Sequence, residues 1–404
     1  MATSHTADHA AESVPCTAEG ILSAVRAIVP ELRARSAEIE RLRRLPEDVV
    51  ELVRGTGVFR MGFAAEFGGP ALTSAEQTRV LEELSYGDTS VGWCAMVGMD
   101  GGLFANYLSE SAVREMFPTL DMSTAGMLAP AGRAERVPGG YRLTGHWKFG
   151  SGITHADWVF AGAHTYSGGE PERTASGTPD WQVMMVRPGE VELIDNWRTT
   201  GLAGTSSMDY TADDVFVPEE RSFSFRAPRS RSGPLSTPDL QMRKMPGVPL
   251  GATRAALDHV RDLARTKVDR MTGRPWAEDP RVQFALGECE MDFLAIRHAV
   301  YRSLEHRWNR LAAGARQEDL SDDERVDTML ARQGAFRGSR AIVRRLYDLL
   351  ATASVYRPSP MDRGLRDLET MCQHFMAQDQ IVQSAGAFLL GGKPQNPLVL
   401  GILD

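Results

Sequence analysis

The chain has 404 residues, of which 42% are hydrophobic and 24% are charged, and its formal net charge is −8. These values are typical of a globular protein with one large domain or two to three ordinary ones. The acidic balance and the lack of a long basic tract argue against a nucleic-acid partner, because phosphate contacts need clustered Lys and Arg. No apolar run reaches the length needed to span a membrane, so no membrane partner is expected either.

The cysteines and the N-terminal residues indicate the cellular compartment in which the protein works. The four cysteines are scattered and form no CxxC pair, which indicates reduced thiols rather than a disulfide framework or a zinc site. The first 18 residues lack the basic and apolar regions of a signal peptide. We therefore expect a cytoplasmic protein without a metal site.

Helical periodicity dominates from about residue 19 to 125 and predicts an N-terminal helical domain. The small, polar stretch over 1–18 that precedes it is expected to be flexible. Pro46 stands at a plausible first helical position, where its missing N–H costs nothing. Thr73 and Glu76 have the spacing of a capping box, which predicts the start of another helix.

The pattern changes to period two over 126–240, with turns at Gly, Pro and Asp, and this predicts a central β domain. A polar stretch at 226–239 leaves that domain and is either a solvated loop or a mobile lid. Long amphipathic segments over 241–404 predict a C-terminal helical bundle. Helices, then strands, then helices indicate an α+β protein, and no GxGxxG or GxxxxGK[ST] motif is present.

Three ordered segments, over 66–93, 139–163 and 197–218, resemble the acyl-CoA dehydrogenase superfamily. The last of them, WRTTGLAGTSSMDYTADDVFVP, is similar to that superfamily's G(M/L)xGTxSxDxxxxDVxVP stretch. The resemblance covers nearly the whole chain. It implies the acyl-CoA dehydrogenase fold: an N-terminal helical domain, a central β-barrel-like domain and a C-terminal four-helix bundle, through which the family usually forms homotetramers.

The glutamate base of an acyl-CoA dehydrogenase is missing from both places where the family carries it. The stretches over 241–257 and 387–404 contain no Glu, and MLAPAGRAERVPGGY replaces the flavin-binding TEPxxGSD stretch. Removing an α-proton from a thioester needs a positioned base. The sequence therefore disfavours the dehydrogenase alternative.

The C-terminal region resembles the flavin-dependent monooxygenase branch, because Arg363, Arg366, Asp367 and His374 fall on its RxxRDxxxxxxH pattern. Enzymes of that branch take reduced flavin from a separate reductase, bind O₂ and form a C4a-(hydro)peroxyflavin that hydroxylates phenols or related compounds. The resemblance places His374 near the flavin C4a–N5 edge, to stabilise the peroxide and move a proton. Asp367, two helical turns earlier, either orients His374 or pairs with Arg363 or Arg366.

The resemblance also implies a set of flavin-binding residues around WKFGSG, residues 147–152, which is similar to the family's WxFxSG. Ser151 would place its hydroxyl near the flavin N5, and the flanking glycines would allow close backbone approach. Backbone groups of three residues would meet the pyrimidine edge, and Arg281 would reach a flavin phosphate, often across a subunit boundary. The whole implied set is Trp93, Met127, Leu128, Ala129, Trp147, Phe149, Gly150, Ser151, Gly152 and Arg281.

Plain structural roles remain open for several of these residues. Trp147 and Phe149 alternate along one strand, so both are expected on the same face, as a flavin wall or as core aromatics. Ser151 is alternatively a turn residue between two glycines. Trp93 lies among small residues and is alternatively a packing residue.

The sequence thus predicts the oxygenase of a two-component flavin-dependent monooxygenase. It would use FMN, or else FAD, delivered reduced by a partner reductase, together with O₂. The expected substrate is a phenolic or polycyclic aromatic compound, such as an aromatic polyketide of antibiotic biosynthesis. The alternatives are an N-oxygenase of an amine or amino sugar and a non-catalytic ligand-binding relative.

Overall fold

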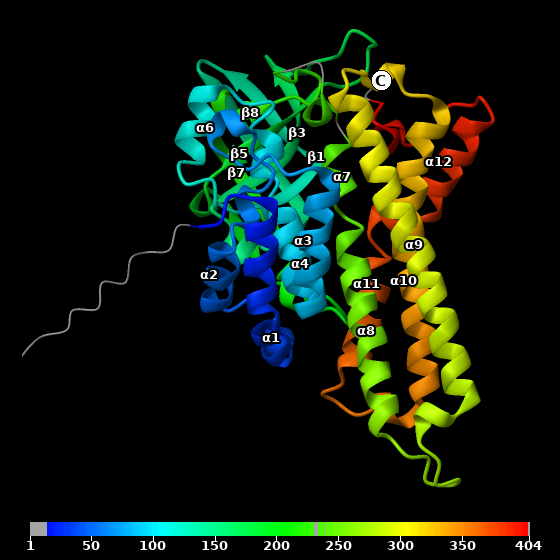
Figure 1. The fold of residues 1–404 in the computed structure, drawn as a ribbon. Coiled ribbons are helices and arrows are strands. Elements are labelled where there is room, and N and C mark those ends of the chain that lie inside the picture. The colour runs from blue at the N-terminus through cyan, green and yellow to red at the C-terminus, as the bar shows by residue number, and fades with distance from the viewer. Residues whose placement is uncertain (1–13, 230–232, 238, 403–404) are drawn as a thin grey trace, which may run out of the picture.

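The computed structural model describes residues 14–229, 233–237 and 239–402 of the chain. Most of the 1–18 segment, expected to be flexible, lies outside this range. The order of helices, then a sheet, then helices is confirmed. In Figure 1 the blue and cyan N-terminal helices and the sheet form one half of the molecule, and the long yellow-to-red helices stand beside them as a column.

The N-terminal helices begin at identifiable caps. Thr73 and Glu76 form the expected capping box, in which the Thr73 hydroxyl accepts from the Glu76 N–H and the Glu76 carboxylate accepts from the Thr73 N–H. Pro46 is the N-cap of its helix rather than the first helical residue. These helices are α1 (Ala18–Leu42), α2 (Glu47–Gly55), α3 (Ser74–Gly87), α4 (Thr89–Gly98), α5 (Gly101–Phe104) and α6 (Glu110–Met116).

The strands form one eight-stranded sheet in the order β6-β7-β2-β1-β3-β5-β8, with β4 paired to β3. β1 and β3 are parallel, and the other pairs are antiparallel. The strands are β1 (Thr124–Val137), β2 (Gly140–Gly150), β3 (Trp158–Ser167), β4 (Glu170–Pro171), β5 (Trp181–Val186), β6 (Glu192–Ile194), β7 (Met208–Pro218) and β8 (Ser222–Phe223).

The C-terminal part is a bundle in which α10 contacts α8, α9, α11 and α12. Ser321 and Glu324 form a second capping box at the start of α10. The helices are α7 (Leu240–Arg243), α8 (Gly247–Thr266), α9 (Pro280–Ala312), α10 (Asp322–Leu350), α11 (Pro360–Met371) and α12 (Asp379–Leu389).

One hydrophobic core joins the two helical parts. It contains buried side chains of α1, α3 and α4 together with side chains of the bundle, among them Leu32, Leu81, Leu257, Leu346 and Leu368. Burial of apolar surface is the main stabilising term in folding, so this shared core fixes α4 and α11 relative to each other. Of the predicted site residues, α4 carries Trp93 and α11 carries Asp367, and α11 leads directly to His374.

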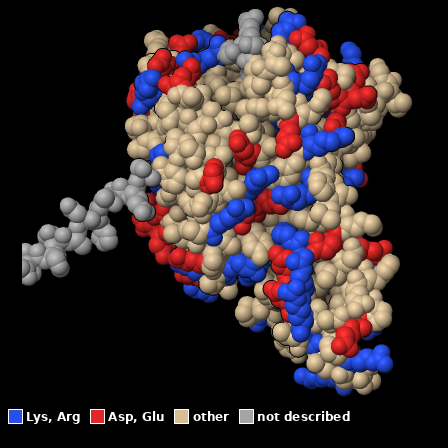
Figure 2. All heavy atoms as spheres, in the orientation of Figure 1, with Lys and Arg blue, Asp and Glu red and all other residues tan. Residues whose placement is uncertain are grey.

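The described surface mixes charges of both signs. In the view of Figure 2, Lys, Arg, Asp and Glu are interspersed, and several meet where the bundle joins the other half. No described helix is long and apolar enough to cross a membrane. Within the same residues, no three His, Cys, Asp or Glu side chains gather as a metal site would require.

Candidate active site

The end of strand β2 does not keep the simple alternation that the sequence predicts. Phe149 has a φ of 64°, and the register between β2 and β7 shifts between Trp147 and Gly150. A bulge of this kind re-aims the side chains that follow it. Trp147 is fully buried, whereas Phe149 is 55% exposed, so the two rings do not share a face.

Trp147 occupies the core position that the sequence left open as an alternative. Its indole Nε1 donates to the Gly162 carbonyl oxygen at 2.8 Å, and its ring stacks on Tyr210 at 5.4 Å between centroids. Phe149 instead lies at the surface, where its ring meets the edge of Trp197. Its ring is therefore available to a group that binds at this strand end.

Ser151 follows Phe149 by two residues and is only 7% exposed. The Trp93 indole, on α4, donates to the Ser151 Oγ at 3.1 Å. The Ser151 Oγ also lies 2.7 Å from the Ser207 Oγ, which lies 2.7 Å from the Thr205 Oγ1. Ser151 is therefore part of a buried hydrogen-bonded chain as well as a turn residue.

The two glycines beside Ser151 are closely covered by the protein itself. A Cβ on Gly150 would lie 2.9 Å from the Ile153 Cδ1. Gly152 has a φ of 78°, and a Cβ there would lie 3.1 Å from the His155 Nε2. At both glycines, neighbouring side chains fill the space that a Cβ would occupy. The role of these glycines toward a flavin stays a prediction.

His374 lies next to Trp93, with 5.5 Å between the ring centroids in an edge-to-face arrangement. It follows α11 and caps the short turn Phe375–Ala377, where its Nδ1 accepts from the Met376 N–H at 3.2 Å. Surrounding protein and the positive charge of Arg332 lower the pKa of His374, so the ring is neutral at pH 7. Because Nδ1 accepts, the ring proton sits on Nε2, which can donate.

Asp367 does not contact His374 among the described residues. The sequence argument assumed one continuous helix, but α11 ends at Met371, so His374 does not lie on the same helical face. The Asp367 Oδ1 instead accepts from the Leu202 N–H at 2.6 Å. Among the described residues no ion pair joins Asp367 to the two arginines: Arg366 pairs with Glu40 and Asp362, and Arg363 acts on Asp367 through its charge alone.

The remaining predicted flavin residues fall into two places. Met127 donates its N–H to the Tyr210 hydroxyl at 2.9 Å, so that donor is already used. The β1–β3 register shifts between Met127 and Gly132, which leaves Leu128 and Ala129 outside the strand pairing. Arg281 lies at the start of α9, is 82% exposed, and pairs with Asp279 at 2.7 Å. Its predicted role toward a phosphate stays a prediction.

Sequence reasoning missed Thr205, Ser207 and Leu202 as residues of this site. They belong to the longer G(M/L)xGTxSxD stretch that carried the family resemblance. The run of three hydroxyl residues, Thr-Ser-Ser, directly before β7 was the feature of the sequence that could have indicated them. The structure brings them under Ser151 because the Gly152 N–H donates to the Thr205 carbonyl oxygen at 2.8 Å.

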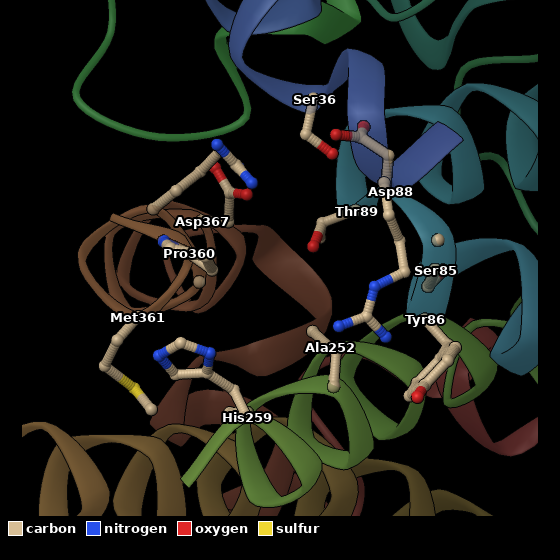
Figure 3. Close-up of a pocket in the computed structure, with 16 residues that line it drawn as sticks. Ser36, Ser85, Tyr86, Asp88, Thr89, Ala252, His259, Pro360, Met361 and Asp367 are labelled. Atoms are coloured by element: carbon tan, nitrogen blue, oxygen red, sulfur yellow. The ribbon is translucent and has the colours of Figure 1, made fainter. Parts of the chain in front are cut away.

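A cavity of about 100 Å³ borders Asp367 and is lined by residues of α1, α3, α4, α8 and α11 (Figure 3). In Figure 3, Asp88, Thr89 and Asp367 border the space, with His259 across from them. Thr89 is one helical turn before Trp93, so the cavity adjoins the candidate site without including its rings. Burial raises the pKa of Asp367 to about 7, and the charge of Asp88 acts in the same direction.

The surface around Ser151 fits a flavin. The exposed ring of Phe149 offers an apolar wall, and Phe375, beside His374, is also exposed. The His374 Nε2 is a donor, the Ser151 Oγ is an acceptor, and Leu128 and Ala129 have backbone groups outside the strand pairing. A planar ring system with polar edges needs this combination of a flat apolar wall and a few oriented polar groups. Fold and site together thus define a flavin-binding protein.

Comparison with known proteins agrees with this class. Residues 17–120 match the family model "Acyl-CoA dehydrogenase, N-terminal domain", and residues 246–379 match "Acyl-CoA dehydrogenase, C-terminal domain". The indole-3-acetate monooxygenase of Acinetobacter baumannii is 28% identical, over 91% of this chain and 94% of that protein. The oxygenase component of FADH(2)-dependent resorcinol hydroxylase from a Rhizobium species is also 28% identical, over 93% and 95%.

Solved structures agree in fold. The HsaA monooxygenase from M. tuberculosis superimposes with a TM-score of 0.84 at 22% identity, over 95% of this chain and 100% of that one. XiaF from a Streptomyces species, solved with FADH2 and glycerol, superimposes with a TM-score of 0.83 at 26% identity, over 94% and 96%. The chain belongs to the acyl-CoA dehydrogenase superfamily and, within it, to the branch of flavin-dependent two-component monooxygenases.

The pKa of Asp367 gives a pH prediction for stability. Because its pKa is raised to about 7 in the fold, against about 3.9 in an unfolded chain, its contribution is full at low pH and is lost as the pH rises through 7. Asp367→Asn keeps an acceptor for the Leu202 N–H but cannot ionise. We expect the melting temperature of Asp367→Asn to rise relative to that of the wild type between about pH 4 and 7, and the difference to stay constant above about pH 8.

The matched control for this comparison is Asp213→Asn, which removes an exposed carboxylate on β7. Its melting curve is expected to stay parallel to that of the wild type over the same pH range. Parallel curves for Asp367→Asn as well would show that Asp367 does not titrate in this window.

Proposed function

We propose that the chain hydroxylates an aromatic small molecule, using a reduced flavin held against Phe149, Ser151 and His374. The single observation that carries the proposal is the arrangement of Trp93, which donates to Ser151 and packs against His374. The Trp93 indole thus has the Ser151 Oγ, an acceptor, on one side and the His374 Nε2–H, a donor, on the other. A reduced flavin at this surface would supply the electrons that activate O₂.

The overall reaction is balanced by the flavin. One substrate hydrogen is replaced by hydroxyl, one oxygen atom leaves as water, and reduced flavin supplies two electrons and two protons as it becomes oxidised. The chain's own residues would orient the reactants. Ser151 would hold the N5 edge, and the Nε2–H of His374 would donate to an oxygen at the same edge. Because His374 is neutral at pH 7, it would act as a donor rather than as a positive charge.

An aromatic substrate is supported by the names of several relatives. These include indole-3-acetate monooxygenases and a resorcinol hydroxylase. TdsC from a Paenibacillus species has been solved with FMN and indole, and XiaF with FADH2, so both flavins are candidates. The missing glutamate base speaks against the dehydrogenase alternative. Several of the relatives are oxygenase subunits or components, which supports a separate reductase.

A homotetramer formed through the bundle is supported by one face of α9. Phe284, Met291 and Leu294 are spaced by seven and three residues, lie on one side of the helix and are all more than half exposed. Large apolar side chains that gather on one helix face indicate a surface covered by another chain. The family resemblance gives the occupant as further copies of this chain.

The need for a reductase is tested on the purified chain. With FMN or FAD and NADH present, we expect no NADH oxidation above the background without protein. Adding a flavin reductase together with an aromatic substrate should start product formation. NADH oxidation by the chain alone would contradict the two-component proposal.

The role of His374 is tested with two variants that separate chemistry from capping. His374→Asn keeps a side-chain acceptor for the Met376 N–H, whereas His374→Ala removes both the cap and the ring. Both are expected to bind reduced flavin and to release hydrogen peroxide in place of product. The step that the ring assists should slow by about 10²- to 10⁴-fold.

Melting temperature and product per flavin oxidised are measured on the same preparations. His374→Asn is expected to melt near the wild type and still to lose coupling. If His374→Ala is destabilised and both variants keep wild-type coupling, His374 serves only as a helix cap.

The α9 face is tested by sedimentation of Met291→Glu and Leu294→Glu. Each is expected to shift the chain to smaller species, because a charge buried between subunits is costly. Met271→Glu is the matched control, since Met271 is exposed on the loop between α8 and α9. A wild-type chain that sediments as a monomer would contradict the tetramer.

A further inference from the structure

The chain of hydroxyl groups beneath Ser151 has fixed ends. At one end the Trp93 Nε1 donates to the Ser151 Oγ at 3.1 Å. Two contacts of 2.7 Å then join Ser151 to Ser207 and Ser207 to Thr205. At the other end the Thr205 Oγ1 donates to the Leu202 carbonyl oxygen at 2.8 Å. All five residues are buried, and Ser151 keeps the largest exposed fraction of the five.

The chemistry of the two ends sets the direction of every hydrogen between them. An indole N–H can only donate, and a carbonyl oxygen can only accept. Each hydroxyl has one hydrogen to give. Thr205 gives its hydrogen to the Leu202 carbonyl, so Ser207 must give its own to Thr205. Ser151 must then give its hydrogen to Ser207.

Ser151 is left with no hydrogen for an outside partner. One of its two lone pairs takes the Trp93 N–H, and the other remains on the part of the side chain that is still exposed. Toward the surface between Phe149 and His374, Ser151 can therefore only accept. The group that satisfies it must carry a hydrogen.

We infer that Thr205 and Ser207 are positioning residues that make the site select reduced flavin over oxidised flavin. The inference rests on the proposed function, which places the flavin N5 at Ser151. Reduced flavin carries a hydrogen on N5 and can donate it to Ser151. Oxidised flavin has a bare acceptor at N5, so two lone pairs would face each other. The hydroxyl chain thus favours uptake of the reduced flavin and release of the oxidised flavin after turnover.

Thr205→Val is the sharpest variant, because the Leu202 carbonyl at the end of the hydroxyl chain stays hydrogen-bonded. The Leu202 carbonyl still accepts from the Trp197 Nε1 at 3.0 Å and from the Thr205 N–H at 3.1 Å. Ser207 loses its acceptor and is free to reverse, which lets Ser151 turn its hydrogen toward the flavin. Ser207→Ala breaks the chain one step nearer to Ser151.

The measurement is the dissociation constant of FMN and of FAD in each redox state, taken anaerobically for the reduced form. We expect the wild type to bind the reduced flavin more tightly. In Thr205→Val and Ser207→Ala the ratio of oxidised to reduced dissociation constants should fall by roughly 2- to 12-fold, the value of one hydrogen bond. Thr205→Ser, which restores the hydroxyl, should return the ratio to that of the wild type.

Ser206→Ala is the matched control, because the Ser206 hydroxyl is buried beside the chain and has no hydrogen-bond partner among the described residues. It should leave the ratio unchanged. An unchanged ratio in both Thr205→Val and Ser207→Ala, or an equal loss of affinity for both redox states, would overturn the inference. A wild-type chain that binds neither FMN nor FAD in either state would instead overturn the proposed function. Melting temperatures identify any variant that fails to fold, in which case the other variant decides.

Discussion

The arrangement of the site depends on two of the hydrogen bonds that Leu202 makes. Its N–H donates to the Asp367 carboxyl on α11, and its carbonyl accepts from the Thr205 hydroxyl. The C-terminal bundle therefore holds, through one residue, the loop that supports Ser151. Arg366 adds a bond from its guanidinium to the Thr200 carbonyl, and a Cβ on Gly201 would collide with the Arg366 carbonyl oxygen. The arginine-aspartate pattern and the stretch before β7 are therefore in direct contact.

Asp367 thus supports the site rather than acting in it. A buried carboxylate is costly unless its oxygens are satisfied, and here the Leu202 N–H and the charges of Arg363 and Arg366 favour the ionised form. These contacts do not fully offset the cost of burying the carboxylate, so the pKa of Asp367 stays raised. The same side chain that fixes the Leu202 loop therefore makes the stability of the fold depend on pH between about pH 4 and 7.

Much of the fold could be predicted from the sequence, because periodicity and caps are local. The capping box of Thr73 and Glu76 is an example. The errors arose where a local rule was extended over a break. The positive φ of Phe149 separates its ring from Trp147, and the end of α11 at Met371 separates His374 from Asp367. Thr205 and Ser207 could not be assigned, since only tertiary contact brings their hydroxyls beneath Ser151.

The central claim is that a reduced flavin lies between Phe149, Ser151 and His374. A structure of the chain with reduced flavin, determined without oxygen, tests it most directly. The account predicts the isoalloxazine against the Phe149 ring, with N5 about 2.7–3.2 Å from the Ser151 Oγ and an oxygen-reacting edge open toward the His374 Nε2. A flavin bound elsewhere, or one whose N5 faces a donor other than Ser151, would contradict the account.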